Sequence, residues 1–155
     1  MKINIIPLLL WFNFLSAQWE TISLPNSEQI DKIIADNNIL YVGTVLAKVY
    51  QSVDYGESWT QLGGDIDEIS YATDVLHKKE NVLFFSHNIG SEDYNFRSFY
   101  NGEDWEAWEP LPSQTSSFTH MKSNADYLLT IISGVIAYSA NHGYTWTLIS
   151  QPPLA

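Results

Sequence analysis

The side chains of this sequence that could do chemistry are mostly carboxylates. They stand in two short groups: Asp65, Asp67 and Glu68, and then Glu103, Asp104, Glu106 and Glu109. A glycoside hydrolase needs two carboxyl groups about 5 to 10 Å apart, and no local motif marks such a pair here. The first group could also bind calcium, but it lacks the glycine and the ligand spacing of a recognised calcium loop. Because both groups are expected in surface turns, we predict no catalytic residue among them.

The other reactive residue types give no site either. The histidines are scattered, without the spacing that would put two ring nitrogens on one metal: His77, His87, His120 and His142. The sequence has no cysteine, which excludes disulfides, thiolate metal sites and a lipid anchor on Cys. Phosphate-binding glycine motifs and the G-x-S-x-G nucleophile elbow are also missing. We therefore expect no metal site and no cofactor.

Composition and charge argue against some partners. With 155 residues, 45% of them hydrophobic, the chain can form one domain with a buried core. Its formal net charge is −11, a sign that repels phosphate backbones and anionic membrane surfaces. We therefore expect no nucleic-acid partner, and we expect most of this charge on a solvated surface.

The N-terminal segment differs from the rest of the chain and predicts export. Lys2 is the only charge in residues 1–17, an apolar run extends from Ile3 to Leu15, and small residues follow at Ser16 and Ala17. This run is shorter than the roughly 20 residues needed to span a bilayer, so we interpret residues 1–17 as a signal peptide. The alternative is a buried N-terminal helix or strand. No second hydrophobic segment of this kind follows, so we expect an extracellular or periplasmic protein without a stable membrane anchor.

The elements that carry these residues repeat along the chain. Trp19, Trp59, Trp105 and Trp146 stand 40, 46 and 41 residues apart, which fits the period of a four-stranded propeller blade and gives units of about 19–59, 59–105 and 105–150. A shared pattern precedes the last three tryptophans. Its members are Ser52, Asp54, Gly56 and Trp59; Ser98, Gly102 and Trp105, with Tyr100 in the Asp position; and Ser139, Asn141, Gly143 and Trp146.

The pattern S-x-D-x-G-x-x-W resembles the Asp box, also called the bacterial neuraminidase repeat. This box occurs in sialidases, sortilin-type receptors, xyloglucanases and photosystem assembly factors, and the resemblance covers residues 19–150. The residue types suit a tight corner between antiparallel strands: Asp or Asn caps free N–H groups, Gly permits positive φ, and Trp buries a large apolar surface. We therefore predict that the box residues hold turns and do not contact a ligand.

Apolar runs between the boxes complete the predicted fold, which is all-β. Runs at 38–43, 81–86 and 126–131 suit strands buried on both faces, and shorter strands are expected before them at 30–35, 69–76 and 118–122. The sequence thus predicts a partial β-propeller of about three four-stranded antiparallel blades in residues 18–155. An extra outer strand is expected at the N-terminus, at 18–22, because this segment resembles the strands that begin at Trp59 and Trp146.

The middle unit is longer than the others, and its extra residues are polar. We predict a loop at 88–95, and loops on rigid scaffolds often carry recognition. A tolerated insertion without a role is the alternative. The candidate binding residues in this loop are Asn88, Ser91, Glu92, Asp93 and Tyr94.

Three blades are fewer than the four to eight that close a typical propeller. Two explanations stay open: the chain is a fragment of a longer propeller, which we favour, or copies of the chain share one ring. In both cases the open blade edges are expected to promote self-association.

Function follows from the resemblance and not from a site. Arg97 is the only arginine, whereas the resemblance implies three for a sialidase, so sialidase activity is not expected. We predict a secreted, non-catalytic repeat protein that binds protein or glycan. The alternatives are a fragment of a xyloglucanase-like glycoside hydrolase and a scaffold for assembly of another exported complex.

Overall fold

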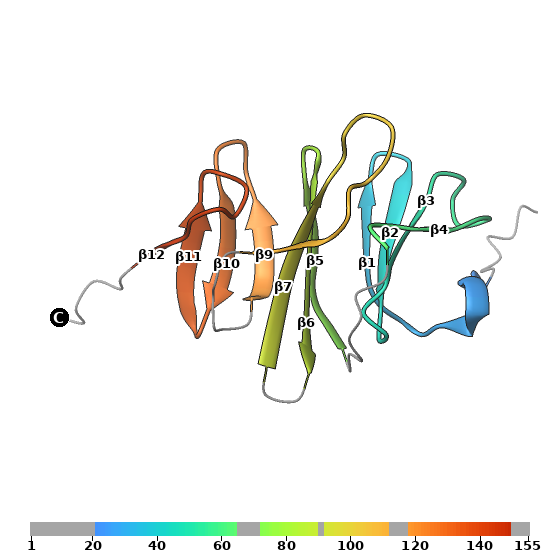
Figure 1. The fold of residues 1–155 in the computed structure, drawn as a ribbon, viewed down its shortest axis with the longest axis horizontal. Coiled ribbons are helices and arrows are strands. Elements are labelled where there is room, and N and C mark those ends of the chain that lie inside the picture. The colour runs from blue at the N-terminus through green and yellow to red at the C-terminus, as the bar shows by residue number, and fades with distance from the viewer. Residues whose placement is uncertain (1–20, 65–71, 90–91, 112–117, 150–155) are drawn as a thin grey trace, which may run out of the picture.

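A computed structural model describes residues 21–64, 72–89, 92–111 and 118–149, and within these ranges the structure is three sheets side by side in a row (Figure 1). Blade 1 contains β1 (Ile30–Asp36), β2 (Ile39–Thr44), β3 (Val49–Ser52) and β4 (Thr60–Gln61). Blade 2 contains β5 (Ala72–Lys79), β6 (Val82–Ile89), β7 (Glu92–Phe99) and β8 (Glu109–Pro110). Blade 3 contains β9 (Phe118–Ser123), β10 (Leu128–Ile132), β11 (Val135–Ser139) and β12 (Thr147–Leu148).

Every sheet has its four strands in chain order and antiparallel, which confirms the predicted all-β partial propeller. The only helix in the described ranges is a short 3-10 turn, η1 (Pro25–Ser27), so no described helix could cross a bilayer. The predicted signal peptide at 1–17 lies outside the described residues, as do residues 18–20 of the predicted extra strand.

Each blade buries both of its faces where another blade lies beside it. In β6 the buried Leu83 and Phe85 face blade 1, while Val82 and Phe84 face blade 3. Side chains of a strand alternate between the two faces of a sheet, so an unbroken apolar run supplies both interfaces. The core is therefore divided into slabs between blades, as expected from the apolar runs.

The fourth strands correct the predicted frame of the middle unit. Trp59 and Trp146 directly precede β4 and β12, but β8 follows Trp108 and not Trp105. The strand register agrees, because Thr60, Glu109 and Thr147 pair with the residue before the box serine in each blade. The middle corner is longer than the others, so Trp105 forms a separate bridge with Tyr100 before the fourth strand begins.

The predicted loop at 88–95 is wrong for most of its length. Asn88 lies in β6, and Glu92, Asp93 and Tyr94 lie in β7, where Asn88 pairs with Asp93; Ser91 lies outside the described residues. The extra residues lengthen a hairpin because alternate side chains of these strands bury an aromatic stack. The ring of His87 stacks on those of Tyr94 and Phe96, at centroid distances of 5.4 and 5.7 Å.

Candidate functional site

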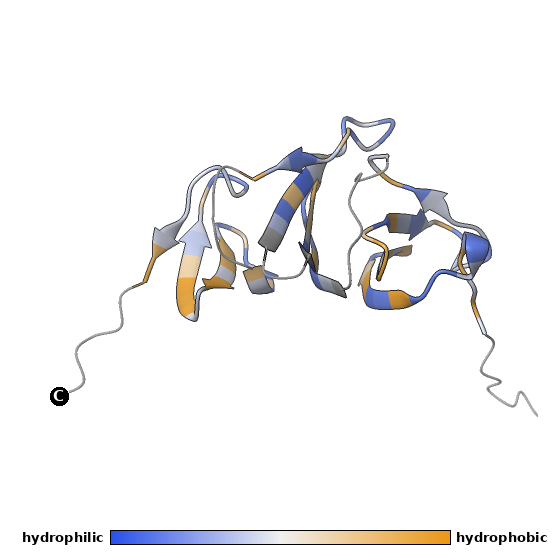
Figure 2. Ribbon diagram, turned by 60° about the horizontal axis from the view of Figure 1, so that its bottom comes forward, coloured by the Kyte–Doolittle hydropathy of each residue, from blue (hydrophilic) through white to orange (hydrophobic). Residues whose placement is uncertain are grey.

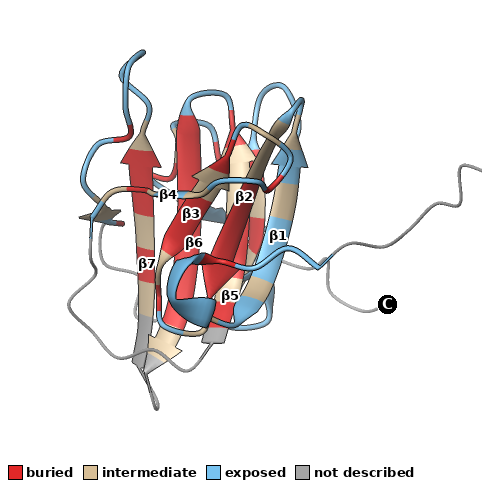
Figure 3. Cartoon of the chain, turned by 90° about the vertical axis from the view of Figure 1, so that its right-hand side faces the viewer, coloured by how far each residue is buried: buried red, intermediate tan, exposed pale blue. Residues whose placement is uncertain are grey.

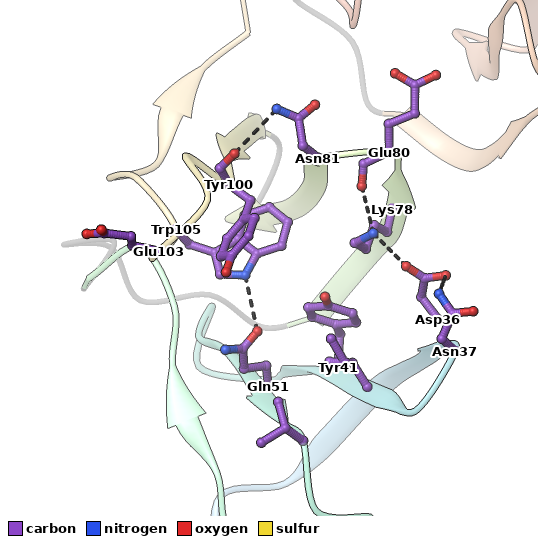
Figure 4. Close-up of a pocket in the computed structure, with 12 residues that line it drawn as sticks. Asp36, Asn37, Tyr41, Gln51, Lys78, Glu80, Asn81, Tyr100, Glu103 and Trp105 are labelled. Carbon is purple, nitrogen blue, oxygen red and sulfur yellow. Dashed lines mark hydrogen bonds and ion pairs between the residues drawn. The ribbon is translucent and has the colours of Figure 1, made fainter.

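A cavity lies between blades 1 and 2, at the end of the blades where β1 turns into β2 and β5 turns into β6 (Figure 4). We call it the junction groove, and its volume is about 410 Å³. Its residues come from two blades and from four separate turns and strands. They comprise an aromatic floor of Tyr41, Tyr100 and Trp105, together with a polar rim of Asp36, Gln51, Lys78, Glu80 and Glu103.

The aromatic floor is built by Trp105, which reaches from blade 2 to blade 1. Its indole N–H donates to Gln51 Oε1 at 3.1 Å, and its ring meets Tyr41 edge-on, with centroids 6.0 Å apart. Tyr100 packs against the other side of Trp105 at 5.6 Å and is 38% exposed. The groove therefore presents an accessible aromatic ring, Tyr100, fixed by a buried one.

The rim of the groove carries more negative than positive charge. Lys78 Nζ donates to Asp36 Oδ2 at 2.5 Å and to the Glu80 carbonyl at 2.6 Å. The ammonium group of this lysine is therefore bound by other residues of the rim. The side chain of Glu80 is 61% exposed, with its Oε1 3.7 Å from Lys79 Nζ, and Glu103 is exposed on the opposite side. The lining of the groove thus contains three carboxylates and one lysine.

Tyr41 contributes a neutral hydroxyl to the groove. Burial raises its pKa to about 12, with further contributions from the nearby Asp36 carboxylate and Tyr100. The phenol therefore stays protonated at physiological pH, and its oxygen points into the groove (Figure 4). The floor can donate one hydrogen bond but supplies no charge.

The corner before Trp105 is held by Asn101 and not by the residue that occupies the Asp position. Asn101 Oδ1 accepts from the N–H groups of Glu103 and Asp104, both at 3.0 Å, which is an Asx turn. The Ser98 hydroxyl donates across the corner to the Glu106 carbonyl at 2.6 Å. Tyr100 therefore does not cap the corner: its hydroxyl donates to the Gly102 carbonyl at 3.1 Å, and the residue lines the groove.

The two complete boxes bond within themselves. In blade 1 Ser52 Oγ donates to Asp54 Oδ1 at 2.7 Å and accepts from the Gly56 N–H at 2.7 Å, and Asp54 Oδ1 accepts from the Ser58 N–H at 2.9 Å. Hydrogen bonds from Ser58, and then from Ser52, lower the pKa of Asp54 from 3.8 to about 2. The carboxylate of this box therefore acts within its own turn.

The box of blade 3 repeats this arrangement with an amide in place of the carboxylate. Ser139 Oγ donates to Asn141 Oδ1 at 2.9 Å and accepts from the Gly143 N–H at 2.9 Å. Asn141 Oδ1 in turn accepts from the Thr145 N–H at 3.0 Å. The same backbone geometry thus forms with or without a charge at this position.

The acidic groups considered from the sequence do not come together as a pair. Glu109 is bound to Arg97 Nε at 2.5 Å, and Asp104 Oδ1 accepts from the Trp105 N–H at 2.7 Å. Glu106 is exposed, and Glu103 alone reaches the junction groove. Asp65, Asp67 and Glu68 lie outside the described residues.

The predicted recognition residues lie at the other end of blade 2 from the groove. Asn88 Nδ2 donates to Asp74 Oδ2 at 3.0 Å, and Tyr94 stacks on the buried His87, whose pKa is lowered by burial. Within the described ranges, no cluster of three His, Asp or Glu side chains could hold a metal ion. Sequence reasoning missed the groove because its residues come from distant turns; the one local signal was Tyr100, an aromatic in a box position that calls for Asp.

Comparisons with known proteins support the fold. Neither the protein-family models nor the curated proteins contain a match. Among solved structures, the chain is similar to the β-propeller in "YCF48 bound to D1 peptide", with a TM-score of 0.68 and 19% identity over 86% of this chain. It is also similar to the NanB sialidase from Streptococcus pneumoniae, with a TM-score of 0.35 and 23% identity over 71% of this chain. The chain spans 43% of the YCF48 chain and 19% of the sialidase chain, and at 19% identity the likeness to YCF48 concerns the fold alone.

Proposed function

We propose that this chain is an exported, non-catalytic propeller module that binds a protein partner in the junction groove. The observation that carries the proposal is the exposed ring of Tyr100 beside a rim of three carboxylates and one committed lysine. A propeller of similar fold is described as bound to a peptide, which is compatible with this class of partner.

The chemistry of the groove favours a cationic side chain of the partner. A Lys or Arg head over the face of an aromatic ring gains about 0.5 to 1 kcal/mol at an exposed site. Glu103 stands where it can meet the same charge, and the exposed Glu80 can do so in competition with Lys79, whose Nζ lies 3.7 Å from Glu80 Oε1. Lys78 is held by Asp36. The net charge of −11 would also accelerate the approach of a basic partner.

Catalysis is not supported by the same residues. A glycoside hydrolase uses one protonated acid in apolar surroundings and one carboxylate opposite it. Among the acids of the groove, Glu103 is exposed to solvent, Glu80 is exposed and lies 3.7 Å from Lys79 Nζ, and Asp36 is paired with Lys78. Release of reducing sugar from extracellular polysaccharides by the purified protein would contradict a non-catalytic role and favour the hydrolase alternative.

A peptide-binding experiment tests the proposal. Fluorescence anisotropy would compare labelled hexapeptides that differ only in a central Lys, Arg, Gln or Glu. We expect the Lys and Arg peptides to bind most tightly and the Glu peptide least. Tyr100→Ala should weaken the Lys peptide about 2- to 5-fold, the loss of one exposed cation–π contact.

Matched variants separate the groove from the rest of the surface. Tyr55→Ala removes another exposed tyrosine, which lies outside the groove, and should leave peptide binding unchanged. The double change Glu80→Gln and Glu103→Gln should reduce the preference for Lys over Gln. Equal binding of all four peptides, or equal effects of Tyr100→Ala and Tyr55→Ala, would contradict the proposal.

A neutral glycan is the second candidate ligand, because sugars stack on exposed aromatic rings such as Tyr100. This ligand needs the ring but not the carboxylates. Glycan binding that is lost with Tyr100→Ala and kept with Glu80→Gln plus Glu103→Gln would favour it.

Export rests on the apolar run from Ile3 to Leu15 and the small residues after it. Mass spectrometry of the protein recovered outside the cytoplasm should give Gln18 as the first residue. An intact Met1 on the mature protein would contradict cleavage at this position.

A further inference from the structure

The two outer faces of the row are equivalent to faces that are buried inside it. The box serines fix this equivalence, because they pair with Leu40, Leu83 and Leu128 at the same position of each second strand. We call the face of a blade that looks along the chain toward the next blade its front face, and the opposite one its back face. No described sheet lies against the back face of blade 1 or the front face of blade 3 (Figure 1). On the back face of blade 1, β1 is open, whereas Val42 and Tyr50 are buried with Leu24 of the N-terminal segment packed on them.

The back face of blade 1 exposes a residue that the other blades bury. One position of the first strand is equivalent in the three blades: it pairs with the second-strand residue two places after the leucine opposite the box serine. This position is held by Ile33, Leu76 and Met121. Leu76 and Met121 are 8% and 6% exposed, but Ile33 is 62% exposed. Figure 3 views this end of the row, with β1 largely exposed or intermediate in front of the buried strands of blade 2.

The front face of blade 3 shows the complementary exposure. Ile136 stands three residues before its box serine, as Val49 does in blade 1, yet Ile136 is 52% exposed and Val49 is fully buried. Around it Tyr127, Leu129, Tyr138 and Ile149 line a shallow apolar depression. In Figure 2 hydrophobic residues mark the strands at this end of the row.

A polar contact also recurs at each internal interface and lacks its counterpart at the end. The residue before the box serine reaches the corner of the next blade: Gln51 accepts from the Trp105 indole, and Arg97 donates to the His142 carbonyl at 2.8 Å and lies over the Tyr144 ring at 3.5 Å. Tyr138 holds this position in blade 3, where no described sheet follows. Its ring instead meets Tyr127 edge-on.

In place of the fragment explanation favoured from the sequence, we propose that two copies of this chain pack end to end, each placing its blade 3 front face on the blade 1 back face of the other. Both contacts continue the interface that already joins blades 1 to 2 and 2 to 3, so no new kind of surface is required. Two identical contacts related by a two-fold axis close a ring of six blades, within the usual range of four to eight. Tyr138 of one copy then meets the Ser52–Trp59 corner of the other.

Ring closure has a defined cost at the N-terminal segment. Ile22 lies against Gly56 as Leu111 lies against Gly143, so it occupies the place where a preceding blade ends its fourth strand. In the second copy, Ile149 after β12 is the residue equivalent to Leu111. Its N–H donates to the Ile136 carbonyl, as the Leu62 N–H donates to the Val49 carbonyl in blade 1. Closure therefore moves Ile22 away from Gly56 and Leu24 away from Val42 and Tyr50.

The experiment measures the mass of the purified protein in solution by light scattering and sedimentation. We expect twice the chain mass for the unchanged protein and once the chain mass for Ile33→Lys and for Ile136→Lys. Leu46→Lys, an exposed leucine in the turn between β2 and β3, is the matched control and should leave the dimer intact.

Mixing the two monomeric variants gives the decisive result. Ile33→Lys keeps a normal blade 3 and Ile136→Lys a normal blade 1, so one of the two contacts is intact and a mixed dimer should form. Its formation also demonstrates that both variants are folded. A monomeric unchanged protein, a dimer that survives Ile33→Lys, or a mixture that stays monomeric would each overturn the proposal.

Discussion

The corners of blades 1 and 3 differ from the corner of blade 2 in where their polar groups and tryptophans are directed. In the complete boxes, Ser52–Trp59 and Ser139–Trp146, the polar side chains bond within their own turns. The indole N–H groups of Trp59 and Trp146 are buried without a partner among the described residues. The middle corner sends both of its indole N–H groups to blade 1, from Trp105 to Gln51 and from Trp108 to the Leu62 carbonyl. The corner that lacks the box Asp is thus the longer one, and its side chains line a groove between blades.

The largest expected effect concerns the glycines of these corners. Gly143 has a φ of +81°, and a Cβ there would lie 3.2 Å from both Leu111 and Phe84, so Gly143→Ala combines backbone strain with overpacking. Gly102 has a φ of +107° but open space around it, so Gly102→Ala adds strain alone. We expect losses of about 2–4 and about 1–2 kcal/mol of unfolding free energy, respectively. Urea unfolding measures both, and equal losses would remove the distinction between the corners.

The box serines provide the next comparison. Ser52→Ala removes a hydroxyl that donates one hydrogen bond and accepts from the buried Gly56 N–H, which is then unsatisfied, for a loss of about 1–3 kcal/mol. Ser98→Ala removes a single hydrogen bond to the Glu106 carbonyl, for about 1 kcal/mol. The same unfolding measurement should therefore rank Ser52→Ala above Ser98→Ala, and the reverse order would show that the middle serine is the more important one.

The smallest effect depends on pH and separates the two complete boxes from each other. The pKa of Asp54 is lowered from 3.8 to about 2 in the folded protein. The ionised carboxylate therefore stabilises the folded protein above about pH 4, and this stabilisation is lost as the pH falls from about 4 through about 2. Asp54→Asn copies the amide of blade 3 and should make stability less dependent on pH in this range. Unfolding curves at several acidic pH values check this; parallel losses in both proteins would assign the acid sensitivity to other groups.

Much of the fold was predictable because it repeats. The strands at 30–35, 38–43 and 118–122 were expected from apolar runs and lie within two residues of β1, β2 and β9. The frame of blade 2 was wrong because the spacing of tryptophans cannot distinguish Trp105 from Trp108 once the corner is longer. The hairpin at 82–99 was expected to end in a loop because its residues at 88–95 are mostly polar. The alternating ring side chains of these strands, His87, Tyr94 and Phe96, were not recognised as a strand pattern.

The groove lay beyond sequence reasoning for a different reason. Asp36, Gln51, Lys78 and Trp105 are neighbours only because two sheets stack with a particular offset, and no periodicity along the chain encodes that offset. In the sequence, Tyr100 stood out only as the residue in the Asp position of the middle box. A departure from a repeat pattern, as at Tyr100, was the one available pointer.

Arg97 gives the second junction of the row a buried guanidinium that the first junction lacks. It is almost fully buried, ion-paired with Glu109 in its own blade, and bonded to the His142 carbonyl of blade 3, while Lys79 Nζ reaches the carbonyls of Asn124 and Ala125. The first junction is crossed instead by the Lys78–Asp36 ion pair, by hydrogen bonds from Thr73 to Asp31 and Thr44, and by the indole N–H groups of Trp105 and Trp108. If the row were pulled from its two ends, polar bonds would therefore have to break at either junction before a blade could leave.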